Sequence, residues 1–175
     1  MEWTRFGAVD FGYPAAGGAR CALVVAADIR YSSIVEEHVQ ALSDVAPYEP
    51  GRFYLRELPA IQAVLADTAG LDLLIVDGYV HLDPTGRPGL GAYVHSALSI
   101  PVIGVAKTAF RGATHARTVH RGAARRPLYV TAAGLDAAEA AALVQAMAGR
   151  FRLPDALRRA DQLARTADSR YRANG

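Results

Sequence analysis

The chain has 175 residues, of which 51% are hydrophobic and 21% charged, and its formal net charge is +2 at pH 7. This composition fits one globular domain over residues 1–175 and excludes a disordered chain, which needs low hydrophobicity and high net charge. Its longest apolar runs are too short to cross a bilayer and no signal peptide is visible, so we expect a cytoplasmic protein without a membrane partner.

The charges are unevenly distributed along the chain. Residues 1–105 hold 6 basic and 12 acidic residues, whereas residues 106–175 hold 13 basic and 5 acidic ones. A basic segment beside an acidic one suits a polyanion held next to a cation site. Ordinary solvated helix faces would give the same distribution, so charge alone leaves a nucleic-acid partner open.

Three strands are predicted in the first quarter of the chain. Residues 6–11 and 19–29 are apolar runs, and residues 34–43 partly alternate apolar and polar side chains, as a half-buried strand does. The connections between them are short, and residues 12–18 are rich in Gly, Pro and Ala, which favours a turn. We therefore expect an antiparallel meander.

Helices and strands alternate in the rest of the chain. Residues 52–69 place Leu58, Ile61 and Val64 at helical spacing. Further segments are predicted as strands over residues 71–77, 101–106 and 127–131 and as helices over residues 89–98, 136–149 and 153–170, while residues 107–126 carry no clear pattern.

This order of elements predicts an α/β fold. Three antiparallel strands are followed by parallel strands, joined through right-handed crossovers, in a mixed sheet that helices flank. Ribonuclease H-like domains have this arrangement.

Two acidic residues interrupt the ends of apolar strands. Asp10 ends Gly-Ala-Val-Asp and Asp77 ends Leu-Leu-Ile-Val-Asp. Burying a carboxylate is costly unless something compensates its charge, and Mg²⁺ is a good partner for one or two carboxylates. The expected strand order places the first strand beside the fourth, which brings Asp10 and Asp77 together. Taken singly, each of these two acids is better explained as a strand-end residue that caps a turn, and Glu57 and Asp161 are ordinary helix acids.

Several motifs in one order over residues 5–165 resemble the endonuclease V family. Residues 47–57 read Pro-Tyr-Glu-Pro-Gly-Arg-Phe-Tyr-Leu-Arg-Glu, residues 76–78 Val-Asp-Gly, and residues 101–107 Pro-Val-Ile-Gly-Val-Ala-Lys. Residues 152–155 read Arg-Leu-Pro-Asp and residues 159–161 Arg-Ala-Asp. The leading helical segment of the family has no counterpart before the first strand, so we expect a divergent, N-terminally shortened member.

The resemblance implies an endonuclease that cleaves a DNA or RNA strand 3′ to a deaminated purine, chiefly hypoxanthine, and leaves a 5′-phosphate and a 3′-hydroxyl. It implies Mg²⁺ or Mn²⁺ as the cofactor and a monomer as the active form. Carried onto this chain, Asp10 and Asp77 bind the metal and Glu57 binds or orients it. Asp161 completes a second metal position, and Lys107 contacts the scissile phosphate or the attacking water.

The resemblance also implies a substrate site. Tyr48 is the wedge that enters the nucleic acid, within the loop that holds Pro47, Pro50 and Gly51. The base pocket would come from residues 78–82 and 89–93, with the following expected contacts: Gly78, His81, Gly89 and Gly91.

Some residues depart from the family pattern. Glu49 stands where the wedge has a hydrophobic residue, and Asp83 stands where His precedes Pro84. These changes affect base recognition rather than the carboxylates. An alternative is therefore an endonuclease V-fold protein that binds nucleic acid with weak or no inosine-directed cleavage. Asp28 also ends an apolar strand, but it leaves 19 residues before Tyr48, too few for two more strands, so we interpret it as a turn residue.

Overall fold

The computed structural model describes residues 2–43, 46–47, 49–50, 52 and 54–166. Tyr48 and Gly51 of the predicted wedge lie outside these residues, as does the end of the last predicted helix. Four helices are described, α1 (Tyr54–Leu65), α2 (Leu90–Leu98), α3 (Ala137–Ala146) and α4 (Asp155–Thr166). The strands are β1 (Phe6–Gly12), β2 (Ala19–Ala26), β3 (Ile34–Leu42), β4 (Leu73–Asp77), β5 (Val102–Ala106), β6 (Arg117–Val119) and β7 (Leu128–Ala133).

The strands form one sheet in the order β3-β2-β1-β4-β5-β7-β6. Strands β1, β2 and β3 pair antiparallel, and β1, β4 and β5 are parallel neighbours. This confirms the predicted meander, the placing of the first strand beside the fourth, and the mixed sheet. Strand β7 runs antiparallel to β5, because the connection between them contains no crossover helix that would return the chain to the same edge.

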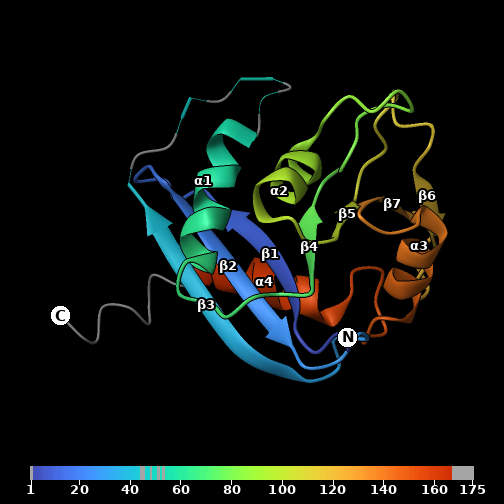
Figure 1. Ribbon diagram of the computed structural model, residues 1–175, viewed down its shortest axis with the longest axis horizontal. Coiled ribbons are helices and arrows are strands. Elements are labelled where there is room, and N and C mark those ends of the chain that lie inside the picture. Colours follow the sequence, from blue (N-terminus) through green and yellow to red (C-terminus); the bar gives the residue numbers. More distant parts are fainter. Residues whose placement is uncertain (1, 44–45, 48, 51, 53, 167–175) are drawn as a thin grey trace.

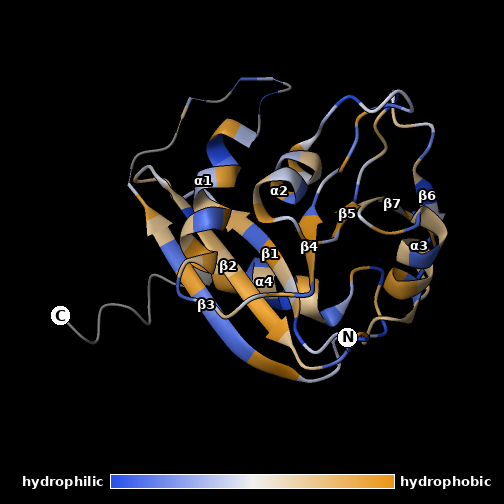
Figure 2. Cartoon of the chain, in the orientation of Figure 1, coloured by the Kyte–Doolittle hydropathy of each residue, from blue (hydrophilic) through white to orange (hydrophobic). Residues whose placement is uncertain are grey.

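Helices cover both faces of the sheet (Figure 1). One core packs α1 and α2 against side chains such as Val9, Leu74 and Val76. The other packs α3 and α4 against the alternate side chains, such as Ala8 and Ile75. The central strands are therefore apolar on both faces, which Figure 2 shows as predominantly hydrophobic ribbons for β2 and β4.

One strand is more exposed than predicted, and one was not predicted. Strand β3 lies at the edge of the sheet and is more exposed than a half-buried strand: Val35 keeps 53% of its surface accessible. Strand β6 was not predicted, because it has three residues, two of them exposed, and it forms by pairing with β7. No helix in the described part of the chain is long and apolar enough to span a membrane.

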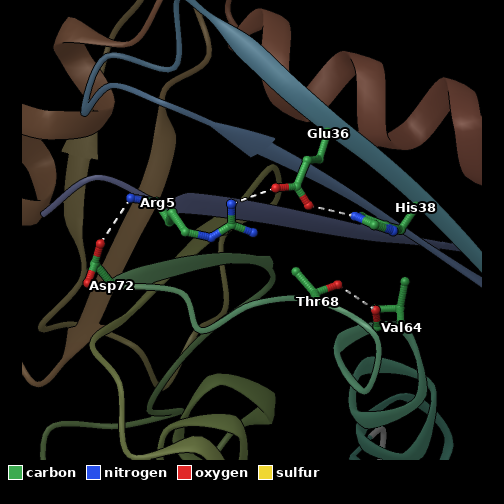
Figure 3. A network of polar contacts seen from close by, with 6 residues as sticks. All are labelled: Arg5, Glu36, His38, Val64, Thr68 and Asp72. Carbon is green, nitrogen blue, oxygen red and sulfur yellow. Dashed lines mark hydrogen bonds and ion pairs between the residues drawn. The ribbon is translucent and has the colours of Figure 1, made fainter.

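Charged side chains at the amino end of β1 form a paired network (Figure 3). The Arg5 guanidinium donates a hydrogen bond to Glu36 at 2.5 Å, and the second oxygen of Glu36 lies 2.9 Å from His38 Nε2. The backbone N–H groups of Thr4 and Arg5 donate to the Asp72 carboxylate at 2.8 and 2.9 Å. This network lies at the amino end of β1, at the opposite end of the strand from Asp10.

Candidate active site

Three predicted site residues meet at the carboxyl ends of the parallel strands. Val9 of β1 is paired with Val76 of β4, so the next residues, Asp10 and Asp77, lie side by side. Lys107 directly follows β5, the neighbour of β4. Side chains alternate along a strand, so Asp10 and Asp77 project to the face that α3 and α4 cover.

Lys107 lies in the same small cavity as the two aspartates. Its Nζ is 3.4 Å from Asp77 Oδ2. The cavity is closed from the helix side by Leu153 and Leu157, at the start of α4. The ammonium therefore reaches the carboxylate pair from β5, the third of the parallel strands.

Asp10 is a buried carboxyl, with 8% of its surface accessible. Burial is the main cause that raises its pKa to about 7, and repulsion from Asp77 and Asp161 raises it further. A hydrogen bond of 2.8 Å from the backbone N–H of Phe11 and the charge of Lys107 act in the opposite direction. The effect of Asp161 shows that α4 brings a further acid within electrostatic range.

Glu57 reaches the same cluster from the other helical layer. It lies in the first turn of α1, and the Tyr13 hydroxyl donates a hydrogen bond to it at 2.9 Å. Burial raises the pKa of Glu57 to about 7, and Asp77 and Asp10 raise it further against the effect of Tyr13. Arg56 lies 4.3 Å from the centre of the Tyr13 ring. Tyr13 was not predicted as a site residue.

Two other acids have local partners. Asp161 of α4 accepts a hydrogen bond of 2.9 Å from Arg165, one helical turn later. Asp28 accepts hydrogen bonds from the backbone N–H groups of Arg30, Ser32 and Ser33. Asp28 is therefore a turn residue, as predicted.

The donor set fits a hard cation held by few protein ligands. Among the described residues, no group of three or more His, Cys, Asp or Glu side chains forms a complete metal site by itself. Mg²⁺ usually keeps several waters and takes only one or two carboxylates, with substrate phosphate oxygens completing its shell. Asp10 and Asp77 offer two adjacent carboxylates, and burial raises the pKa of Asp10 and Glu57, so a cation bound here would stabilise their ionised forms.

A cavity of about 550 Å³ opens directly beside the carboxylates. Glu57 and Asp77 form part of its wall, so the cavity and the acidic cluster are continuous. The predicted residues Pro50, Gly78 and Gly89 line it, and the other lining residues are Tyr54, Tyr79, Leu82, Arg87, Pro88, Leu90 and Phe110. Its aromatic members and Arg87 were not singled out from the sequence.

Other predicted substrate contacts lie away from this cavity. Gly91 is buried against Val80, and a Cβ at position 91 would come within 2.7 Å of Val80 Cγ2. Gly91 thus allows α2 to pack closely and does not face the cavity. His81 forms an isolated β-bridge with Pro88, and Pro47 is exposed outside the lining.

Long-range hydrogen bonds to the backbone fix the loops around the site. Arg152 donates to the carbonyl oxygens of Lys107 and Pro127 at 2.5 and 2.7 Å, which holds the turn that presents the lysine. The Tyr79 hydroxyl donates to the Thr108 carbonyl at 2.7 Å and accepts from the Phe110 N–H at 2.9 Å. Only the resemblance of residues 152–155 to a family motif pointed to Arg152.

Gly104 of β5 leaves room for the loop that follows Asp77 to pack against the strand. A Cβ at this position would lie 2.5 Å from the Gly78 carbonyl oxygen and 2.8 Å from Thr131 Oγ1. The same Thr131 oxygen accepts a hydrogen bond of 2.8 Å from the Val80 N–H. Glycine is therefore required here because the backbone approaches closely.

Comparison with known proteins identifies the family. The endonuclease V sequence profile matches residues 1–133. An endonuclease V from Azotobacter vinelandii is 33% identical over 178 residues, covering 89% of this chain and 80% of the relative. The crystal structure of endonuclease V from Streptomyces avermitilis has a TM-score of 0.80 at 27% identity, over 97% of this chain and 83% of that chain.

A more distant solved structure shares the fold. Endonuclease V from Ciona intestinalis, in complex with a 24mer DNA containing an inosine followed by a ribo-adenosine, has a TM-score of 0.83 at 16% identity. The match covers 97% of this chain and 87% of that chain. Because the family profile matches well over half of the chain and the fold agrees, the chain belongs to the endonuclease V family of phosphodiester-cleaving nucleases.

Proposed function

We propose that this protein is a metal-dependent endonuclease that cleaves a DNA or RNA strand 3′ to hypoxanthine and leaves a 5′-phosphate and a 3′-hydroxyl. One observation carries the proposal: Asp77, which lies beside Asp10 and 3.4 Å from Lys107, also lines a cavity of about 550 Å³ together with Glu57. Cavities of this size are typical of small-ligand sites and can receive a base that has left its stack. The inosine-containing DNA bound by the Ciona relative supports the same substrate class.

The acidic cluster would hold Mg²⁺ or Mn²⁺. Asp10 and Asp77 in their ionised forms would be direct ligands, and Glu57 would orient a bound water from α1. When bound, such a cation polarises a phosphoryl oxygen and lowers the pKa of a coordinated water. Lys107 would place its ammonium beside the phosphate oxygens, and Asp77, 3.4 Å away, keeps that ammonium directed into the site.

The cavity would receive the deaminated base. The rings of Tyr79 and Phe110 lie 6.0 Å apart on its wall and offer apolar surface to a flat purine. Arg87 also lies on the wall, and a guanidinium donates well to the O6 and N7 acceptors of a 6-oxopurine. Adenine presents an amino donor at the same position, so this wall favours hypoxanthine over adenine.

The proposal is tested with an oligonucleotide that contains one inosine, presented as single-stranded DNA, duplex DNA and RNA. We expect cleavage one linkage beyond inosine in Mg²⁺ or Mn²⁺, and loss of both cleavage and Mn²⁺ binding in Asp77→Ala. Asp28→Ala is the matched control, because Asp28 also follows an apolar strand but caps a turn. Equal Mn²⁺ affinity in wild type and Asp77→Ala would contradict the metal site. Inosine binding and intact Mn²⁺ affinity without cleavage would favour the binding-protein alternative.

A further inference from the structure

An exposed aromatic residue flanked by arginines lies on the α4 side of the site. Phe151 keeps 44% of its surface accessible. The guanidinium of Arg150 is 4.9 Å from the centre of its ring, and that of Arg158 is 4.3 Å from it. The proposed mechanism uses none of these residues, although exposed rings and arginines together are typical of surfaces that bind single strands.

These residues line a groove of about 680 Å³, which also includes Arg152, Leu153 and Asp161. The groove is continuous with the candidate active site. Leu153 lines both the groove and the small cavity that holds Asp10, Asp77 and Lys107. The two hollows therefore meet at Leu153.

The loop that carries Phe151 is held rigidly. Arg121 is buried, and its guanidinium donates hydrogen bonds to the carbonyl oxygens of Met147, Gly149 and Phe151 at 2.6, 2.9 and 3.0 Å. Gly122 packs directly against the Arg150 carbonyl, because a Cβ there would lie 2.4 Å from that oxygen. A ring presented on a rigid loop loses little conformational entropy when it binds a partner.

We infer that this groove binds the part of the nucleic-acid strand that lies 3′ to the cleaved linkage, with a base stacked at Phe151 and phosphates at Arg150 and Arg158. The inference rests on the proposed function. The base cavity lies on the α1 and α2 side of the carboxylates, whereas the groove lies on the α4 side. Cleavage 3′ to the base in the cavity therefore directs the strand beyond the scissile phosphate toward the groove.

The charges favour a polyanionic strand over other partners. Within the part of the chain that the structure describes, the ion pair of Arg158 is with Asp155 at the long distance of 3.7 Å, so its charge is only weakly compensated. An incoming base would displace one guanidinium from the Phe151 ring, and that guanidinium would then be able to contact a phosphate. Neutral apolar partners would leave both arginines uncompensated.

The test measures strand binding in EDTA, so that cleavage does not enter. Fluorescence anisotropy compares an oligonucleotide that ends just after inosine with oligonucleotides extended by about eight nucleotides on the 3′ or the 5′ side, a length within the range of single-strand sites. We expect the 3′ extension alone to tighten binding, and Phe151→Ala to weaken that complex about 10-fold without changing binding of the short strand. The double variant Arg150→Ala/Arg158→Ala should lower the salt dependence of 3′-extended binding by about 1.4 in log–log slope.

Two controls separate stacking from a folding defect. Phe151→Trp should retain the affinity for the 3′-extended strand, and Trp3→Ala, an exposed aromatic before the amino end of β1, should leave all affinities unchanged. A 3′ extension that adds no affinity in the wild type, or an equal loss for short and extended strands in Phe151→Ala, would overturn the inference. If an inosine-free strand shows the same Phe151-dependent gain but inosine strands are not cleaved, the groove stands and the proposed function fails.

Discussion

The two ends of β1 hold their charges in opposite ways. At the amino end, hydrogen bonds with Arg5 and His38 lower the pKa of Glu36 to about 2 (Figure 3). At the carboxyl end, burial and repulsion from Asp77 raise the pKa of both Asp10 and Glu57 to about 7. The amino end of β1 therefore carries a carboxylate paired with basic side chains, whereas the carboxyl end carries a cluster of acidic side chains.

The charged residues at the amino end of β1 therefore contribute to the stability of the fold, whereas those at the carboxyl end are available for chemistry. At the amino end, the Glu36 carboxylate already has Arg5 and His38 as partners. The carboxyl end has an electrostatic cost that a cation would relieve, and groups with strongly raised pKa values in a cleft are candidates for function. Substitutions and changes of pH at the two ends of β1 test this contrast.

The largest effect is expected from removing the Lys107 ammonium that lies beside Asp77. Lys107→Met should lower the rate of strand cleavage by about 100-fold to 1,000-fold, the range found when a group that stabilises a developing charge is removed. Because Lys107 lowers the pKa of Asp10, the variant should also need a higher pH for full activity. Single-turnover rates across pH measure both effects, and Lys107→Arg is the charge-preserving control. A pH profile that does not move would show that the ammonium has no influence on the aspartate.

The second effect concerns stability without metal. A folded-state pKa of about 7 for Asp10 and Glu57 means that the folded protein binds protons more tightly than the unfolded chain between about pH 4 and pH 7. Their contribution is therefore fully present below the unfolded pKa and is lost as pH rises through about 7. In EDTA we expect the free energy of unfolding to fall by a few kcal/mol between about pH 5 and pH 8.

Denaturant titrations at several pH values measure this slope. Asp10→Asn/Glu57→Gln should flatten it, and Mg²⁺ should stabilise the wild type more at high pH than at low pH, because protons and metal compete for the same oxygens. A slope that persists in the double variant would assign it to other groups.

The smallest effect is expected at the amino end. Glu36 has a lowered pKa, so it stabilises the fold above its unfolded pKa near 4 and loses this contribution as pH falls toward about 2. The network is partly exposed, so Glu36→Gln should cost about 1 kcal/mol or less at neutral pH and leave cleavage unchanged. Urea unfolding and the inosine cleavage assay test the two halves of this prediction. A loss of cleavage would mean that the two ends of β1 are coupled.

The sequence predicted the parts of the site that local pattern and topology determine. Asp10 and Asp77 end apolar runs, and the order of elements alone placed their strands side by side, as the pairing of Val9 with Val76 confirms. The rejection of Asp28 also followed from the spacing of elements along the chain. The structure bears it out, since three backbone N–H groups bind its carboxylate.

Other features depend on contacts that no local pattern encodes. Arg152 and Arg121 bind carbonyl groups 25 to 45 residues away, so the sequence shows only two arginines in a basic segment. Strand β6 lacks apolar alternation and exists because β7 offers it a partner. Gly91 was predicted to face the base, but a glycine in a sequence does not reveal whether a ligand or a helix neighbour requires the space.

The crowding around Gly104 has a consequence for how this enzyme can change over evolution. Gly104 contributes no functional group, yet a side chain there would collide with the loop that begins at Asp77 and forms the cavity wall. New base preferences can arise by exchanging wall residues such as Arg87 and Phe110, whereas this position stays fixed whatever the substrate. Libraries built to redirect specificity should therefore randomise the wall and leave the glycine untouched.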